Sequence, residues 1–201
     1  MTDVESFVRF CESEFGTAVM EREAAYIEQY LAPEDRILHV GCGIGALEER
    51  LPKYDVVGLD RSPAMIRTAR ERVAAPFVLG DATALPVATG AVDTFVSVAT
   101  LGFIPDIDAV LAEAVRVLDT DGTFVALILN TRSEYVRSGL RREGSYFQRL
   151  FHRDTDALTD TIFEYVDGDS EYFLGVADRT VVESRDPTTA AIVAVVGTPA
   201  R

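Results

Sequence analysis

The stretch Arg36-Ile37-Leu38-His39-Val40-Gly41-Cys42-Gly43-Ile44-Gly45 decides the fold. Its first half is an apolar run that is typical of a buried strand, and its second half places three glycines at alternate positions. Because glycine has no Cβ, the backbone at such a strand end can approach a ligand closely. Residues 44–51 are predicted to form a helix, whose N-terminus would present free N–H groups and the positive end of its dipole. The stretch therefore predicts a loop that holds a nucleotide-like cofactor.

Around this stretch, apolar strands alternate with amphipathic helices, which is typical of a parallel sheet covered on both faces. We expect an α/β fold with a Rossmann-like, doubly wound, mostly parallel sheet, a C-terminal antiparallel hairpin and an N-terminal helical cap. The predicted strands are 36–40, 54–60, 77–79, 92–98 and 123–130, with 178–183 and 190–196 as the hairpin. The predicted helices are 4–15, 17–31, 44–51, 63–73, 107–118 and 154–166.

The length of 201 residues and the hydrophobic share of 48% suit a single domain with one core. We expect a helical cap at 1–32, a cofactor-binding core at 33–130, and a segment at 131–201 with a lid, the last helix and the hairpin. No run reaches the roughly 18 apolar residues of a membrane span. The acidic N-terminus does not resemble a signal peptide, and only two cysteines are present, so a cytoplasmic location is expected.

The formal net charge is −14, and Lys53 is the only lysine. Large negative charge keeps a protein soluble in strong salt, so a halophilic source is slightly favoured over a mesophile with an acidic surface. Nucleic acid is not an expected partner, because nonspecific affinity for it comes from cations that meet phosphates. The sequence shows no metal-ligand spacing and no nucleophile–base pair of the Ser/His/Asp or Cys/His kind. We therefore expect no metal and assign no catalytic residue.

The glycine loop alone fits both a G-x-G-x-G loop and a dinucleotide fingerprint. Asp60 ends the second strand, where a carboxylate can bind a ribose diol, and it suits both. Asp81 ends the third strand and would reach the adenine end of a ligand laid across the strand tips, because ligands of open α/β sheets bind there. A hairpin after the fifth strand, in place of a second βαβ half, argues against a nicotinamide enzyme.

With these residues the sequence resembles the class I S-adenosylmethionine-dependent methyltransferases, in their small UbiE-like (type 11) group. The glycine loop, Asp60, Gly80-Asp81-Ala82 and Leu85-Pro86 follow one another in the order of that family, and the resemblance runs from about residue 15 to 196. It implies the class I methyltransferase fold, S-adenosyl-L-methionine as cofactor and S-adenosyl-L-homocysteine as product. It also implies that the glycine loop contacts the methionine part of the cofactor and that Asp60 holds the ribose hydroxyls. Arg61, Met65, Asp81 and Ala82 would then meet the adenine, and Val98 would lie beside the sulfonium. The cofactor-binding residues so implied are His39, Gly41, Cys42, Gly43, Gly45, Asp60, Arg61, Met65, Asp81, Ala82 and Val98.

One residue departs from the family pattern. Members usually have Asp or Glu two residues before the first glycine, and this chain has His39. The favoured interpretation is a half-buried histidine satisfied by a neighbour. The alternative is that His39 contacts the amino end of the cofactor and makes binding sensitive to pH.

The expected acceptor is a small molecule. The fourth strand is not followed by the Asn/Asp-Pro-Pro-Tyr-type motif of enzymes that methylate planar amines, which argues against DNA bases. The arginine-rich stretch 132–153 is interpreted as a solvated face rather than an anion site. A non-catalytic cofactor-binding protein and a nicotinamide oxidoreductase stay open as alternatives, and a monomer or homodimer is expected. Position alone suggests five acceptor-site residues, with a turn residue as the competing interpretation for Asn130 and simple packing for the other four: Phe15, Tyr26, Phe103, Asn130 and Tyr135.

Overall fold

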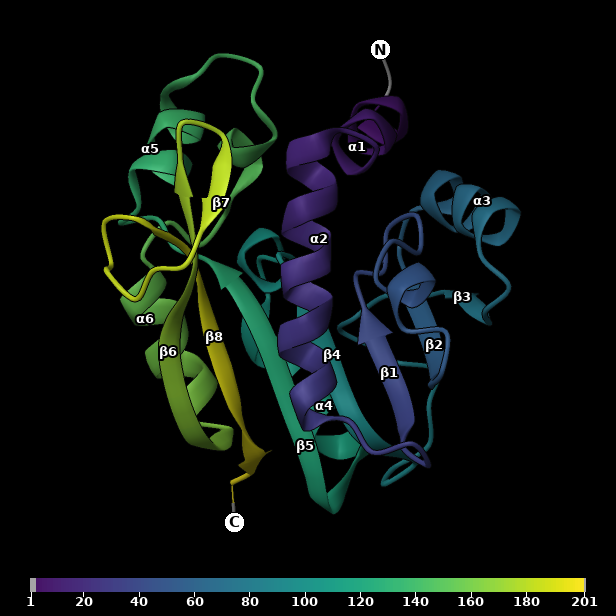
Figure 1. Ribbon diagram of the computed structural model, residues 1–201. Coiled ribbons are helices and arrows are strands. Elements are labelled where there is room, and N and C mark those ends of the chain that lie inside the picture. Colours follow the sequence, from purple (N-terminus) through teal and green to yellow (C-terminus); the bar gives the residue numbers. More distant parts are fainter. Residues whose placement is uncertain (1–2, 201) are drawn as a thin grey trace.

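Eight strands form one sheet in the order β3-β2-β1-β4-β5-β8-β6-β7 in the computed structural model, which describes residues 3–200 (Figure 1). Neighbouring strands from β3 to β5 are parallel, whereas β8 runs antiparallel to both β5 and β6. This confirms the predicted α/β fold with a doubly wound, mostly parallel sheet. The strands are β1 (Arg36–Val40), β2 (Asp55–Asp60), β3 (Phe77–Leu79), β4 (Val92–Val98), β5 (Leu118–Leu129), β6 (Val166–Ala177), β7 (Thr180–Val182) and β8 (Ala190–Pro199).

Helices cover both faces of the sheet, with α2 across one face and α4 behind it (Figure 1). Ile37 of β1 packs in a cluster with Val19 and Ile27 of α2, whereas Leu38 packs with Leu111 of α4. Successive strand residues point to opposite faces, so burial on both faces explains the continuous apolar strands. The helices are α1 (Asp3–Cys11), α2 (Glu14–Ile27), α3 (Pro63–Arg72), α4 (Ile107–Val117), α5 (Glu134–Arg141) and α6 (Thr155–Phe163), and the 3-10 turns are η1 (Glu28–Tyr30), η2 (Glu48–Arg50), η3 (Leu101–Phe103) and η4 (Tyr146–Arg149). Within the described range, no helix combines the length and the apolar character needed to cross a membrane.

The predicted helix at 44–51 is wrong. Only the single 3-10 turn η2 forms there, preceded by irregular turns. Two local features explain this. Gly45 has a left-handed φ of 79°, and Pro52 disfavours helical conformation at the residue before it. The six residues between them are too few for a stable helix. The glycine loop therefore leads into no α-helix, and the helix-dipole argument for ligand binding does not apply here.

The C-terminal hairpin is present, but its predicted partners are wrong. β7 pairs with β6 through a turn at Asp178 and Arg179, and it does not pair with β8. Both turn residues have positive φ, 48° and 58°, as in a two-residue hairpin loop with primed turn geometry. The strand β6 was not predicted because residues 167–170 are polar and exposed. β8 lies between β5 and β6 and extends the parallel sheet by antiparallel pairing.

The N-terminal helices break at a different residue from the one predicted. Ser13 is the N-cap of α2, and its side chain accepts a hydrogen bond from the Gly16 N–H at 3.0 Å. The regular helix ends at Ile27 and continues only as the turn η1. In contrast, the predicted start of the helix at Pro63 is confirmed, because Ser62 caps α3 by accepting from the Met65 N–H.

Candidate functional site

The glycine loop, residues Gly41 to Gly45, leaves the carboxyl end of β1 in a conformation that needs its glycines. Gly41, Gly43 and Gly45 have φ values of 85°, 55° and 79°, a region that only glycine adopts at little cost. The N–H groups of Gly41 and Cys42 both donate to the Leu59 carbonyl, at 2.8 and 3.0 Å. The loop is therefore held against the end of β2.

The loop also lies very close to the end of β4. A Cβ on Gly41 would lie 2.1 Å from the Thr100 Oγ1 atom, a separation at which atoms overlap. The Thr100 hydroxyl donates to the carbonyl of Val98, the last residue of β4, at 2.8 Å. Because Gly41 has no side chain, Thr100 can occupy the space next to it. Val98 therefore lies at the same edge of the sheet as the loop.

Asp60, the last residue of β2, connects the glycine loop to the start of α3. Its Oδ2 accepts from the Gly43 N–H at 3.0 Å, and its Oδ1 accepts from the Ser62 N–H at 2.8 Å. Carboxylate oxygens accept more than one hydrogen bond each, so both retain acceptor capacity. The half-buried carboxylate is thus fixed in orientation at the strand tips.

Asp81 and Ala82 follow β3, the next strand along the same edge. The Asp81 carboxylate is exposed and accepts from the Thr83 N–H and hydroxyl at 2.9 and 2.8 Å. These two hydrogen bonds lower the pKa of Asp81, and the charge of Arg61 lowers it further. Ala82 is buried and packs in the cluster on the α4 face.

Met65 and Cys42 belong to two different packing clusters at the loop. Met65, on the first turn of α3, packs against a cluster of Cys11, Ile44 and Ala46. Cys42 is buried, and burial together with the nearby carboxylates raises the pKa of its thiol. A neutral, buried thiol is a packing group rather than a nucleophile.

His39 is hydrogen-bonded to Glu48 in the buried interior. The His39 Nδ1 is 2.8 Å from Glu48 Oε1, and the His39 side chain is 3% exposed. No partner in residues 3–200 meets His39 Nε2 or Glu48 Oε2, and the same holds for the buried Nε of Arg50. The histidine is therefore satisfied by a neighbour on one nitrogen only. Buried polar atoms without partners are uncommon and point to water or a ligand that is not part of the chain.

Glu23 of α2 is a second buried carboxyl near the loop. It is 4% exposed, and burial raises its pKa to about 8, an effect that the positive charge of Arg50 partly offsets. Its charge acts on Cys11 of α1 and on Tyr135 of α5. Glu23 therefore lies on the part of α2 between Met20, which packs against Ile44 and Ala46, and Ile27, which packs with Leu47, and it holds its proton at neutral pH.

The raised pKa of Glu23 makes the stability of the protein depend on pH. Between the ordinary value of 4.5 and about 8, folded Glu23 keeps a proton that the unfolded chain has lost. The free energy of unfolding therefore falls as pH rises through this range and becomes level above it. Relative to E23Q, the wild type should lose up to about 1.4 kcal/mol per pH unit. Urea denaturation from pH 5 to 9 measures this, with the exposed E21Q on the same helix as control. Identical pH curves for wild type and E23Q would contradict it.

The helix α1 lies on the glycine loop. A Cβ on Gly43 would lie 3.0 Å from the Phe7 ring, and Phe7 packs with the cluster that contains Ile44 and Ala46. A row of aromatic contacts continues away from this point: Phe7–Phe10, Phe10–Phe15, Phe15–Tyr135 and Tyr135–Phe147, with ring centroids 6.3, 6.1, 5.7 and 5.6 Å apart. The N-terminal helices and α5 thus meet above the strand tips through aromatic rings.

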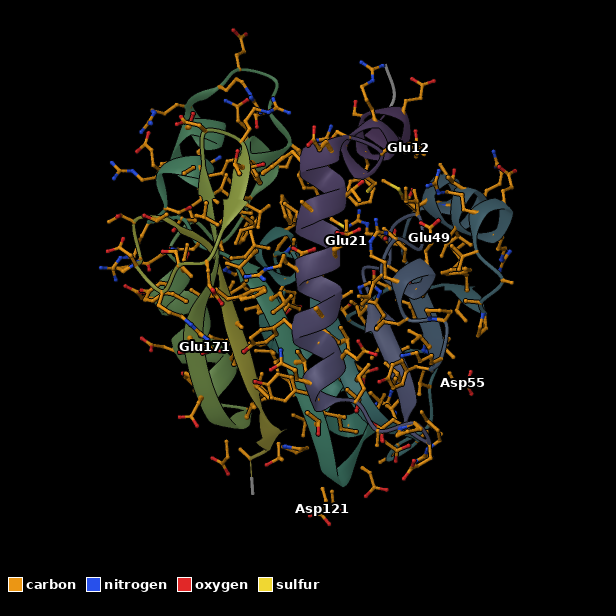
Figure 2. The ribbon with its side chains drawn as sticks, in the orientation of Figure 1. Glu12, Glu21, Glu49, Asp55, Asp121 and Glu171 are labelled. Carbon is orange, nitrogen blue, oxygen red and sulfur yellow. The ribbon has the colours of Figure 1, made fainter. Side chains whose placement is uncertain are left out.

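Two of the five suggested acceptor-site residues, Phe15 and Tyr135, belong to this aromatic row. Phe103 lies apart from it, and its ring packs at a tilt of 40° against Tyr146 with the centroids 4.6 Å apart. Tyr26 does not join them either, since it packs between α2 and β6 and its hydroxyl donates to Glu171 at 2.6 Å. Figure 2 labels Glu171 on β6, well below the loop.

Asn130 is buried and fully hydrogen-bonded. Its Nδ2 donates to the carbonyls of Pro187 and Ala190 at 2.8 and 2.7 Å, and its Oδ1 accepts from the Arg132 N–H at 2.9 Å. The side chain thereby connects the end of β5 to the segment before β8. In this arrangement its polar atoms hold the backbone, which matches the turn-residue interpretation.

Sequence reasoning missed four residues at this site. Glu48, Thr100 and Phe7 carry no local signal, because each gains its role from a contact between distant parts of the chain or across the loop. Glu23 did carry one. It lies on the apolar stripe of α2, three residues after Met20 and four before Ile27, and a carboxyl on a buried helix face is unusual.

Comparisons with known proteins agree with this geometry. A family described as "Methyltransferase domain" matches residues 38–126, which contain the loop, Asp60, Asp81 and Val98. The chain is 35% identical over 114 residues to a malonyl-[acyl-carrier protein] O-methyltransferase of Geobacter sulfurreducens. This match covers 53% of this chain and 43% of the relative. It is 36% identical over 103 residues to the ubiquinone/menaquinone biosynthesis C-methyltransferase UbiE of Methylobacterium nodulans, over 46% of this chain and 41% of the relative. The matched region spans less than half the length of either relative.

A solved structure from Thermotoga maritima has the same fold over nearly the whole chain. It is described as an S-adenosylmethionine-dependent methyltransferase and possible histamine N-methyltransferase. The TM-score is 0.82 at 22% identity, over 98% of this chain and 95% of that one. The three similar proteins are named for transfer to oxygen, carbon and nitrogen.

Proposed function

We infer the function from the family to which the chain belongs, the class I S-adenosylmethionine-dependent methyltransferases. Its cofactor is S-adenosylmethionine, and S-adenosylhomocysteine is the product of that cofactor. We propose that the whole chain acts as one catalytic domain that transfers the methyl group to a small-molecule acceptor. The observation that carries this proposal is the glycine loop fixed to Asp60 at the carboxyl ends of β1 and β2.

The residues at the strand tips fit the cofactor in three respects. The glycine loop offers backbone without side chains, with positive φ at three positions. Asp60 presents an oriented carboxylate for the two ribose hydroxyls, and Asp81 presents another one strand further along, at the adenine end. The unpartnered Nε2 of His39 and Oε2 of Glu48 supply buried polar atoms beneath the loop, where the amino-acid end of the cofactor needs them.

The bound cofactor supplies a methyl group on a sulfonium, which is already activated for in-line attack by a nucleophile. The chain then has to bind the cofactor and the acceptor, orient them toward each other and exclude water. We propose that the loop with Val98 orients the methionine part, that Arg61, Met65 and Ala82 line the adenine, and that Phe7 with α1 covers the loop against water. Cys42, with its raised thiol pKa, serves as packing. No side chain is assigned as the catalytic base.

We propose that the acceptor binds beside the aromatic row, next to Phe15 and Tyr135. This is supported by the position of both rings between α2, α5 and the β6–β7 turn, where the Arg179 guanidinium lies 5.8 Å from the Phe15 ring centroid. Aromatic walls favour an acceptor with a flat or apolar part. The different acceptor atoms of the similar proteins give no reason to prefer oxygen, carbon or nitrogen.

The test of this function is methyl transfer itself. The purified chain is incubated with cofactor labelled in its methyl group and with a panel of quinols, small acids, amines and thiols. Labelled product together with S-adenosylhomocysteine is the expected result for one class. Cofactor binding without turnover across the panel would instead support the non-catalytic cofactor-binding protein.

The remaining proposals concern the setting in which the protein works. We propose a cytoplasmic monomer or homodimer without nucleic acid as partner, in keeping with two free cysteines and a net charge of −14. The charge and the single lysine also support a salt-rich source. Assays are therefore best run in both dilute and molar potassium chloride.

A further inference from the structure

We propose that Glu23 is the buried carboxylate that meets the positively charged amino-acid end of the cofactor, in place of the acid that the family has at position 39. The inference rests on the proposed function. It assigns a cofactor contact to α2, outside the glycine loop and the strand ends that carry the family motifs. It also assigns an event to binding: Glu23 gives up its proton when the cofactor enters.

The position of Glu23 is the first support. Met20, one turn before Glu23 on α2, packs against the cluster of Ile44 and Ala46, and Ile27, one turn after it, lies in one cluster with Leu47. Cys11 packs on Ile44 and Ala46, and the Arg50 guanidinium donates to the Ala46 carbonyl at 2.8 Å. Glu23 therefore lies where α2 meets the residues that follow the glycine loop.

The lack of a partner is the second support. Among residues 3–200, no hydrogen bond or ion pair to the Glu23 carboxyl is found, although the side chain is 4% exposed. The Glu23 oxygens do not belong to the fully buried atoms without a partner, so the small accessible part of this side chain includes its carboxyl. Glu48, the other buried carboxyl, bonds His39 through Oε1 and keeps only Oε2 without a partner. Glu23 is thus the carboxyl with both oxygens available to a cationic ligand group.

The charges at the site explain why a proton has to leave. Free Glu23 is neutral near pH 7, since burial raises its pKa to about 8. A ligand ammonium within a few ångströms favours the ionised carboxyl. On binding, the O–H bond of the Glu23 carboxyl breaks, the electron pair stays on the oxygen, and the proton passes to the buffer. The carboxylate and the ammonium then neutralise each other next to Arg50.

Calorimetry of S-adenosylhomocysteine binding tests this directly. Titrations near pH 7 in phosphate and in Tris, which differ in ionisation enthalpy, give the number of protons released. The expected release for the wild type is between about 0.5 and 1 proton per ligand, and affinity rises with pH up to about 8. E23Q should release almost none and bind at least about tenfold more weakly. Protonation changes of the ligand itself are common to both proteins and cancel in the comparison.

E21Q is the matched control, because Glu21 lies on the same helix but is exposed, and it should release as many protons as the wild type. Binding without proton release by the wild type overturns the inference and leaves the proposed function intact, as does equal release by wild type and E23Q. The wild-type release is decisive even if E23Q folds poorly. Absence of any binding by the wild type in dilute and in molar salt overturns the proposed function, and this inference with it.

Discussion

Replacing Asp60 with alanine is expected to weaken the binding of S-adenosylhomocysteine by about 100-fold or more. The wild-type carboxylate is held by two backbone N–H groups, at 3.0 and 2.8 Å, and faces the strand tips. Hydrogen bonds from ribose hydroxyls to a charged acceptor contribute about 1.5–3 kcal/mol each. Losing both costs about 3 kcal/mol or more, and each 1.4 kcal/mol is about tenfold in the dissociation constant. Isothermal calorimetry measures the change.

Asp55→Ala is the control for Asp60→Ala. Asp55 begins the same strand β2, is exposed, and lies at the opposite end of the sheet from the loop (Figure 2). Its replacement should leave affinity within about twofold, because surface substitutions away from a site change little. Unchanged affinity in Asp60→Ala, with the protein folded, would refute the assignment of Asp60 to the ribose.

Replacing Gly41 with alanine is the second change with a large expected effect, and it acts on stability as well as binding. Alanine at a φ of 85° costs about 1–2 kcal/mol in backbone strain. Its Cβ would also lie 2.1 Å from Thr100 Oγ1 and 2.4 Å from Thr100 Cγ2. Relieving such an overlap costs about 1–3 kcal/mol more. We expect a loss of about 3 kcal/mol in the free energy of unfolding, measured by urea denaturation.

Gly90→Ala separates the two causes. Gly90 has a φ of 65°, and a Cβ there would meet nothing within 4 Å. Gly90→Ala should therefore lower the free energy of unfolding only by its backbone strain, about 1 kcal/mol. The variant should bind S-adenosylhomocysteine as the wild type does. Equal destabilisation by both alanines would show that the close approach of the loop to Thr100 is unimportant.

The parallel half of the fold could be predicted because its signals are local. The strands at 36–40 and 92–98 are largely buried on both faces, 77–79 is a short apolar run at the edge of the sheet, and the bounds of all three agree with β1, β4 and β3. Ser62-Pro63 predicts the start of α3, because serine is a common N-cap and proline is favoured at the first helical position. Asp60 could be assigned to the same edge as the glycine loop because the carboxyl ends of parallel strands meet there.

Other features could not be predicted because they depend on contacts across the chain. β6 forms although residues 167–170 are polar, since pairing with β8 decides its conformation. The partner of His39 is Glu48, nine residues away on a segment expected to be helical. The helix signal at 44–51 was overruled by a left-handed glycine and a proline, both visible in the sequence. Glu23 was likewise visible, as a carboxyl within an apolar stripe.

The central claim is that the strand tips hold S-adenosylmethionine rather than a dinucleotide. Thermal unfolding of the wild type with S-adenosylhomocysteine or with NAD tests it most directly, in dilute and in molar potassium chloride. At 100 times its dissociation constant, a ligand adds about 2.7 kcal/mol to the free energy of unfolding. We predict that S-adenosylhomocysteine raises the unfolding temperature and that NAD leaves it unchanged. Stabilisation by NAD but not by S-adenosylhomocysteine would contradict the account.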